Sequence, residues 1–138
     1  MTLRCLALAL TLLGGSAAAQ DWAGAIAFVQ APEQAGGVGV ANSIEEAIAA
    51  AVQDCIAGGG YEDDCVVTAA CSPAGWSVDV FVQHQAGNHW HEHICGLPTE
   101  AAAQGVEALV CDADARPELI ECAVVQIWND AGTPTMEW

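Results

Sequence analysis

The sequence contains an internal duplication, and this repeat constrains the fold more than any other feature. Three kinds of segment recur in the same order along the chain. The matched segments are 28–30 with 81–83, 43–55 with 99–111, and the stretches that begin at Cys65 and Cys122, at offsets of 53, 56 and 57 residues. Because the matches are collinear and differ in residue type, they predict two similar structural units, at about 23–75 and 76–131.

Each unit has the pattern strand, strand, helix, strand. Short apolar segments separated by Pro and Gly indicate hairpins, and β-branched runs after each helix indicate a further strand. The expected strands are 25–30, 37–41, 65–70, 78–85, 88–94 and 122–128, and the expected helices are 43–55 and 99–111. The sequence therefore predicts an α+β fold of two ββαβ-like repeats, with about six strands and two helices.

The predicted helices have start signals and apolar faces. Ser43 and Glu46 form a capping box, and Thr99 opens the second helix. Apolar residues at helical spacing are expected to pack on the sheets. These are Ile44, Ile48, Val52 and Cys55 in the first helix, and Val106, Leu109 and Val110 in the second.

The first nineteen residues have the pattern of a secretory signal peptide. A positive charge at Arg4 precedes an apolar run, and small residues lead up to a cleavage site after Ala19. The apolar run is about half of the roughly 20 residues that a membrane span needs. We therefore expect a single mature domain, 20–138, in the periplasm or outside the cell, with no membrane insertion after the signal is removed.

Six cysteines remain after the signal, an even number that is typical of a disulfide framework in an exported chain. They are Cys55, Cys65, Cys71, Cys95, Cys111 and Cys122, and they include no close CxxC pair of the zinc-knuckle type. The duplication makes Cys55–Cys65 and Cys111–Cys122 equivalent bridges from a helix end to the next strand. Cys71 and Cys95 then pair by elimination and join the two units.

The charge balance excludes several functions. The chain has 18 Asp and Glu against two Arg and no Lys, a formal net charge of -16. Nucleic acids and anionic membranes are bound through Lys and Arg, so neither is an expected partner. After loss of Arg4 the net charge becomes -17, and Arg116 is the only permanent cation.

One half of the chain is similar to a known family. The residues are Gly24-Ala25-Ile26-Ala27, Ser43-x-Glu45-Glu46-Ala47, an alanine-rich helix to Cys55, Cys65-Val66-Val67 and Cys71. This pattern, over about 22–71, resembles the secreted bacterial domain of unknown function family 4189, with a diverged likeness as far as Trp128. The resemblance implies an exported, cysteine-containing small domain and carries over no catalytic residue. The second copy departs from it, because His-Trp-His-Glu-His at 89–93 replaces the glycine-rich strand.

All four histidines lie within ten residues, at His84, His89, His91 and His93. If the hairpin turns at Ala86-Gly87, His84 lies opposite His89, with Cβ atoms about 5 Å apart. His84, His89 and His91 then form a three-imidazole array that suits zinc or copper, with His93 as an alternative ligand.

Two other interpretations of the histidines stay open. Val80 and Val82 would share the face of this array, which favours burial against the helix and a structural role. The imidazoles would also titrate near pH 6.5, as a pH switch does.

Other candidate sites give weaker signals. The acidic clusters, at 62–64, 112–114 and 118–121, lack the spacing of a calcium loop, and we expect solvated loops there. Ser43, Ser72 and Ser77 are the only serines after the signal, and no GxSxG motif is present. Tryptophans favour core packing, with an aromatic binding patch at Trp76 and Trp90 as the alternative.

The sequence thus predicts a non-enzymatic exported module with no catalytic residues. We expect its acidic surface and tryptophans to bind a cationic protein, peptide or polymer, and no cofactor is required. The alternative is a periplasmic protein that binds divalent zinc or copper through the histidine-rich hairpin. The oligomeric state is not predicted.

Overall fold

The computed structural model describes residues 24–136, so the expected signal peptide and its cleavage site lie outside the described residues. In this part of the chain, no helix has the length and apolar character that a membrane crossing requires.

Six strands form two antiparallel three-stranded sheets. Sheet A has the order β2-β1-β3, with β1 at Ala25–Ala31, β2 at Ala35–Ala41 and β3 at Val66–Cys71. Sheet B has the order β5-β4-β6, with β4 at Trp76–His84, β5 at His89–Leu97 and β6 at Leu119–Trp128. Helix α1 (Ile44–Ala57) follows β2, and the short helices α2 (Glu100–Gln104) and α3 (Val106–Val110) follow β5. The predicted α+β class with six strands in two similar units is confirmed.

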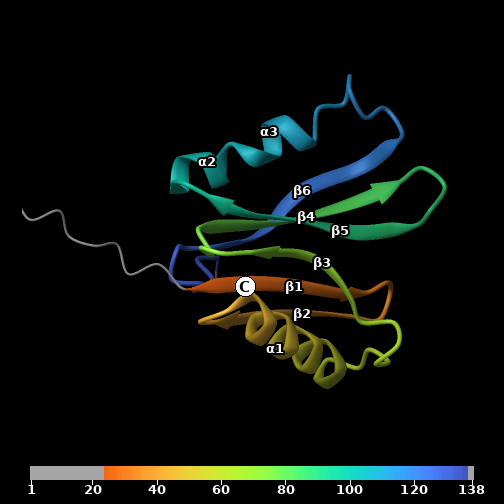
Figure 1. Ribbon diagram of the computed structural model, residues 1–138. Helices are drawn as coiled ribbons and strands as arrows, with labels where there is room; N and C mark the ends of the chain where they lie inside the picture. Colours follow the sequence, from red (N-terminus) through yellow and green to blue (C-terminus); the bar gives the residue numbers. More distant parts are fainter. Residues whose placement is uncertain (1–23, 137–138) are drawn as a thin grey trace, which may run out of the picture.

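The two sheets pack against each other, and the helices cover their outer faces (Figure 1). Strand β1 is buried along its whole length because both of its faces are covered. Its odd-numbered residues, such as Ala27 and Val29, pack against α1, while Ile26 and Phe28 pack on the other side with Trp128. In sheet B the face that includes Val80 packs against α2 and α3. The molecule is therefore a helix, sheet, sheet, helix stack with the central strands β1 and β4 in its middle layers.

Helix α1 begins as predicted, with the Ser43 hydroxyl accepting a hydrogen bond from the amide of Glu46. The most buried line on the helix is Ala47, Ala51 and Cys55 rather than the predicted face, because Ile44, Ile48 and Val52 are only partly buried beside it. Glycines in β2 explain the difference: a Cβ at Gly37 would overlap the carbonyl oxygen of Ala51, and a Cβ at Gly39 would overlap that of Ala47. The backbones approach closely because neither surface carries a large side chain there.

The second predicted helix, 99–111, is interrupted. Gly105 ends α2, its amide bonding to carbonyls of Ala101 and Ala103, and α3 begins at the next residue. Glycine is a poor helix former, so a break at this position is inexpensive. Val106 is buried and Val110 partly buried as expected, but Leu109 is 80% exposed, and its predicted inward position was wrong.

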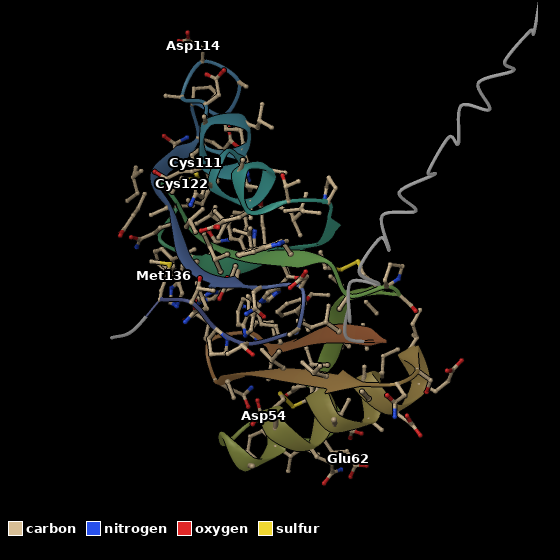
Figure 2. All side chains as sticks on the ribbon, turned by 90° about the vertical axis from the view of Figure 1, so that its left-hand side faces the viewer. Asp54, Glu62, Cys111, Asp114, Cys122 and Met136 are labelled. Carbon is tan, nitrogen blue, oxygen red and sulfur yellow. A yellow bond between two sulfur atoms is a disulfide. The ribbon has the colours of Figure 1, made fainter. Side chains whose placement is uncertain are left out.

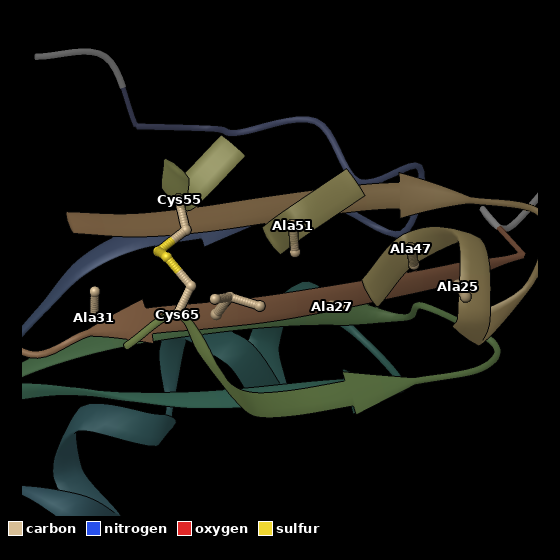
Figure 3. Close-up of a cluster of buried hydrophobic side chains, with 8 residues drawn as sticks. Ala25, Ala27, Ala31, Ala47, Ala51, Cys55 and Cys65 are labelled. Carbon is tan, nitrogen blue, oxygen red and sulfur yellow. A yellow bond between two sulfur atoms is a disulfide. The ribbon is translucent and has the colours of Figure 1, made fainter. Parts of the chain in front are cut away.

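All three predicted disulfides are present. Cys55–Cys65 and Cys111–Cys122 each join the end of a helical segment to the following strand, and Cys71–Cys95 joins β3 to β5 across the two sheets. Figure 3 shows Cys55–Cys65 beside Ala31, Ala47 and Ala51 in the core under α1. The bridges thus supplement cores made largely of small residues.

Gly37→Ala is expected to lower the free energy of unfolding by about 2 kcal/mol, because the new methyl group must separate α1 from β2. Gly36→Ala is the matched control on the opposite face of the same strand. Its Cβ would have only one neighbour, 3.7 Å away, so we expect a change within about 0.5 kcal/mol. Urea unfolding of both variants without reductant measures the difference, and equal stabilities would contradict the close packing.

Replacing both Cys71 and Cys95 with Ala is expected to cost about 3 kcal/mol, the chain-entropy value for a loop closed by cysteines 24 residues apart. Because this is the one disulfide between the two sheets in residues 24–136, we also expect hydrogen exchange to become faster in β3 and β5 before it changes in α1. Uniform acceleration across the domain would show instead that the sheets unfold as one unit.

Candidate functional site

The hairpin between β4 and β5 has a different register from the predicted one. Gln83, not His84, lies opposite His89, and the amide of His84 bonds to the carbonyl of Asn88. The connection therefore has three residues, 85–87, with Gly87 at a φ of 100°. A shift of one residue moves a side chain to the other face of a strand. The predicted triangle of His84, His89 and His91 is consequently wrong, and the ring of His84 accepts a hydrogen bond from the Ala86 amide instead.

The other three histidines lie on one face of β5, which points toward sheet A. Asp79 lies opposite His93 in the register, and Phe81 lies opposite His91 on the same face. Val80 and Val82 alternate with these residues and lie in the core beneath α2 and α3. Val80 and Val82 were expected on the same face as His89 and His91, and this expectation was wrong.

Each imidazole has a different partner. His91 Nδ1 is 2.8 Å from Asp79 Oδ1, and His89 Nδ1 is 3.6 Å from a carboxylate oxygen of Glu33 in the β1–β2 turn. His93 is stacked on Phe28, with ring centroids 4.7 Å apart, and its Nδ1 is 2.8 Å from Thr68 Oγ1. Histidines of sheet B thus contact side chains from β1, its turn and β3.

The polar contacts also include the backbone. Gln30 is 9% exposed. In the amide orientation that satisfies both of its polar atoms, the side chain accepts from the His91 amide at 3.1 Å and donates to the His91 carbonyl at 3.2 Å. A neighbouring strand would make the same two bonds to the His91 backbone. The Gln30 side chain therefore takes the place of a strand at this point of the β5 edge and connects it to sheet A.

The surroundings shift the two inner histidines in opposite directions. The hydrogen bond to Asp79 raises the pKa of His91, against a smaller effect of burial and with additional attraction from the same carboxylate. Burial lowers the pKa of His93, whose side chain is 7% exposed, and the charges of Asp79 and His91 are smaller influences of opposite sign. Protonation is therefore favoured at His91 and disfavoured at His93.

These side chains line an open cleft of about 580 Å³ between the sheets. Its walls come from β1, the β1–β2 turn, β2, the end of α1, and the inner face of sheet B. The polar and aromatic lining residues are Gln30, Glu33, Gln34, Asp54, Asp79, His89, His91, His93, Gln126 and Trp128. The cleft is the place where residues from both units of the duplication come together.

Within residues 24–136, no group of three or more His, Cys, Asp or Glu side chains has a geometry that could hold a metal ion.

The two tryptophans of the predicted aromatic patch belong to sheet B. Trp76 and Trp90 are partly buried against the sheet B core, and Trp90 Nε1 donates to Glu92 Oε1 at 3.1 Å.

The acidic loops lie at the two ends of the stack. Figure 2 shows Glu62 near α1 and Asp114 at the far end, beyond the Cys111–Cys122 bridge. The side chains at 62–64, 112 and 114 are exposed, as predicted for solvated loops.

Sequence reasoning missed Asp79, and the duplication could have identified it. The offset of 53 that matches Phe28 to Phe81 also matches Ile26 to Asp79. The same offset matches Val38 to His91 and Val40 to His93, and the strand pairing confirms it, because Ile26 pairs with Val40 and Asp79 with His93. An apolar set in the first unit is therefore a carboxylate and two imidazoles in the second.

Comparisons with protein-family models, curated proteins and solved structures gave no match for this chain. The class defined by the fold is a small disulfide-stabilised α+β domain of two similar sheet units, and the resemblance to family 4189 stays a prediction.

Asp79→Asn and His93→Gln are expected to change the pH dependence of stability in opposite directions. A histidine with a raised pKa stabilises the fold below its unfolded value of 6.5, and this contribution is lost as the pH rises through the folded pKa. Asp79→Asn should therefore cost more at about pH 5.5 than at about pH 8.

His93 has the reverse dependence. Its lowered pKa stabilises the fold above 6.5, and that contribution is lost as the pH falls. His93→Gln removes the group whose protonation destabilises the wild type at low pH. The free energy of unfolding of this variant should therefore lie closer to that of the wild type at the lower pH. Urea unfolding at both pH values tests the pair, and parallel pH profiles for the two variants would disprove the opposed shifts.

Proposed function

We propose that the chain is an exported, non-enzymatic binding module that recognises a cationic protein, peptide or polymer by its acidic surface. Three disulfides in a small domain suit an oxidising compartment outside the cytoplasm. The observation that carries the proposal is the state of Arg116, the one Lys or Arg of residues 24–136.

Arg116 is held by acids of its own chain. Its two terminal nitrogens donate to the two carboxylate oxygens of Glu92 at 2.9 and 2.8 Å, and its Nε is 3.7 Å from Glu118. This bidentate bond lowers the pKa of Glu92, and the guanidinium side chain is only 25% exposed. The described surface therefore presents many carboxylates and no free Lys or Arg, which attracts cations and repels anions.

The serines and cysteines support a role without covalent catalysis. All six cysteines of the described residues are in disulfides. Ser43 caps α1, Ser72 donates to the Gly24 carbonyl, and the Ser77 hydroxyl is buried without a partner in this part of the chain. None of these hydroxyls has the neighbouring base that an activated nucleophile needs.

The Thr68 hydroxyl contacts the imidazole of His93, but its proton is directed to a backbone carbonyl. Thr68 Oγ1 donates to the Phe28 carbonyl at 3.2 Å, and in this arrangement His93 Nδ1 is the donor in the contact between the two side chains. His93 in this tautomer positions Thr68 and does not deprotonate it.

A capped hexalysine peptide is a direct probe of the proposal. We expect binding at about pH 7.5 that weakens at least about tenfold between about 50 and 500 mM NaCl, because salt screens attraction between exposed charges. The triple variant Glu62→Gln, Asp63→Asn, Asp64→Asn should weaken binding about threefold at low salt. Fluorescence anisotropy of a labelled peptide measures both effects. No binding at low salt, or binding that salt does not alter, would contradict recognition by charge.

A further inference from the structure

We propose that the cleft between the two sheets receives one lysine or arginine side chain of the partner, with Asp79 as the carboxylate that binds its ammonium or guanidinium group. This inference rests on the proposed function, because it assigns a defined site to the recognition of a cationic polypeptide.

The cleft is chemically suited to a donor. The glutamine amides that line it are already used: Gln30 by the backbone of His91, Gln34 by Asp64 and the Tyr61 amide, and Gln126 by the backbone of Ile127 and Met136. The carboxylates retain free oxygens. Asp79 Oδ2 has no hydrogen-bond partner among residues 24–136, and Asp54 uses only Oδ2, which accepts from the Val38 amide.

The imidazole in contact with Asp79 also offers an acceptor when its ring is neutral. His91 Nδ1 faces the carboxylate and therefore carries the proton, which leaves Nε2 of the neutral ring unprotonated. Carboxylate oxygens and an imidazole nitrogen are thus among the side-chain atoms that remain for a ligand. A group with several N–H donors and a positive charge is complementary to such a set.

The duplication provides an internal comparison for this site. In the first unit, Ile26, Val38 and Val40 occupy the positions of Asp79, His91 and His93, and the same strand pairing forms around them. The fold of the unit therefore does not require polar groups there. Asp79 is 14% exposed, and placing a carboxylate at so buried a position is costly unless it is compensated. The contact with His91 compensates the loss of hydration at Asp79 Oδ1, and the incoming cation would do the same at Oδ2.

The cleft is large enough to receive a side chain. Its volume of about 580 Å³ is within the range of roughly 300 to 1,000 Å³ for small-ligand pockets. Gly36 lies opposite Gln30 on the face of β2 that points toward sheet B, so the wall has no side chain at that position. Among the acids of the cleft, the Asp79 side chain is the least exposed, whereas the Glu33 side chain is 57% exposed. A cation would therefore meet Glu33 first and Asp79 deeper in the cleft.

Two independent cleft variants test the inference with the hexalysine peptide at about pH 7.5 and low salt. Asp79→Asn removes the charge and retains an oxygen for His91. Gly36→Leu fills the cleft, and no strain is expected because Gly36 has no positive φ and a Cβ there has only one neighbour, at 3.7 Å. Each variant should raise the Kd about tenfold.

Matched controls are Glu62→Gln, an equal loss of charge on an exposed loop, and Ala49→Leu, an equal gain of bulk on the exposed face of α1. Each control should change the Kd less than about twofold. Circular dichroism and thermal unfolding verify that the variants are folded. A heteronuclear NMR titration should shift the His91 ring and Trp128 indole signals of the wild type, and acetylation of the peptide amines should abolish these shifts.

The outcomes separate the two proposals. If the wild type binds the peptide and the cleft variants behave like the controls, the cleft is not the site, although recognition by the acidic surface stands. If the wild type does not bind at all, both proposals are overturned. A tenfold loss in both cleft variants, with the controls unchanged, supports the assignment.

Discussion

The packing of sheet A against sheet B is the contact on which the rest of the structure depends. Strand β1 is buried on both faces, so its side chains must satisfy a helix on one side and another sheet on the other. Phe28 occupies the centre of that second contact, stacked on His93 and edge-on to Trp128 at 5.0 Å. The cleft forms beside this aromatic group, where the facing strands supply glycine and polar side chains in place of large apolar ones. The same layer therefore holds the two units together and creates the hollow between them.

Small residues decide how the outer layers are attached. Alanines on α1 and glycines on β2 bring the two backbones close together, which limits the apolar area that either can bury. Covalent bridges offset this limit, because each helical segment is fixed to the following strand by a disulfide. Each copy of the duplication thus contains a three-stranded sheet, a helical cover and a disulfide that joins the two. Cys71–Cys95 adds the one disulfide between the copies in residues 24–136.

The order of elements and the cysteine pairing could be predicted because both follow from the duplication, which needs only sequence offsets. The register of the β4–β5 hairpin could not. Ala86-Gly87 suits a two-residue turn, yet Gln85 also enters the loop, and one residue changes the face on which His84 lies. The close contact at Gly37 depends on what lies across from this residue, on helix α1. Asp79 could have been found by extending the internal alignment, whereas the cleft depends on how two sheets are placed, which no local pattern describes.

The paired Arg116 has a consequence for the resistance of the protein to proteases. Trypsin-like proteases cleave after Lys or Arg, and residues 24–136 contain Arg116 as their only such residue. The next residue is Pro117, a poor context for cleavage by these enzymes, and the guanidinium that a protease pocket would have to capture is already bound to Glu92. The scarcity of Lys and Arg therefore leaves residues 24–136 almost without a peptide bond that trypsin-like proteases can cut.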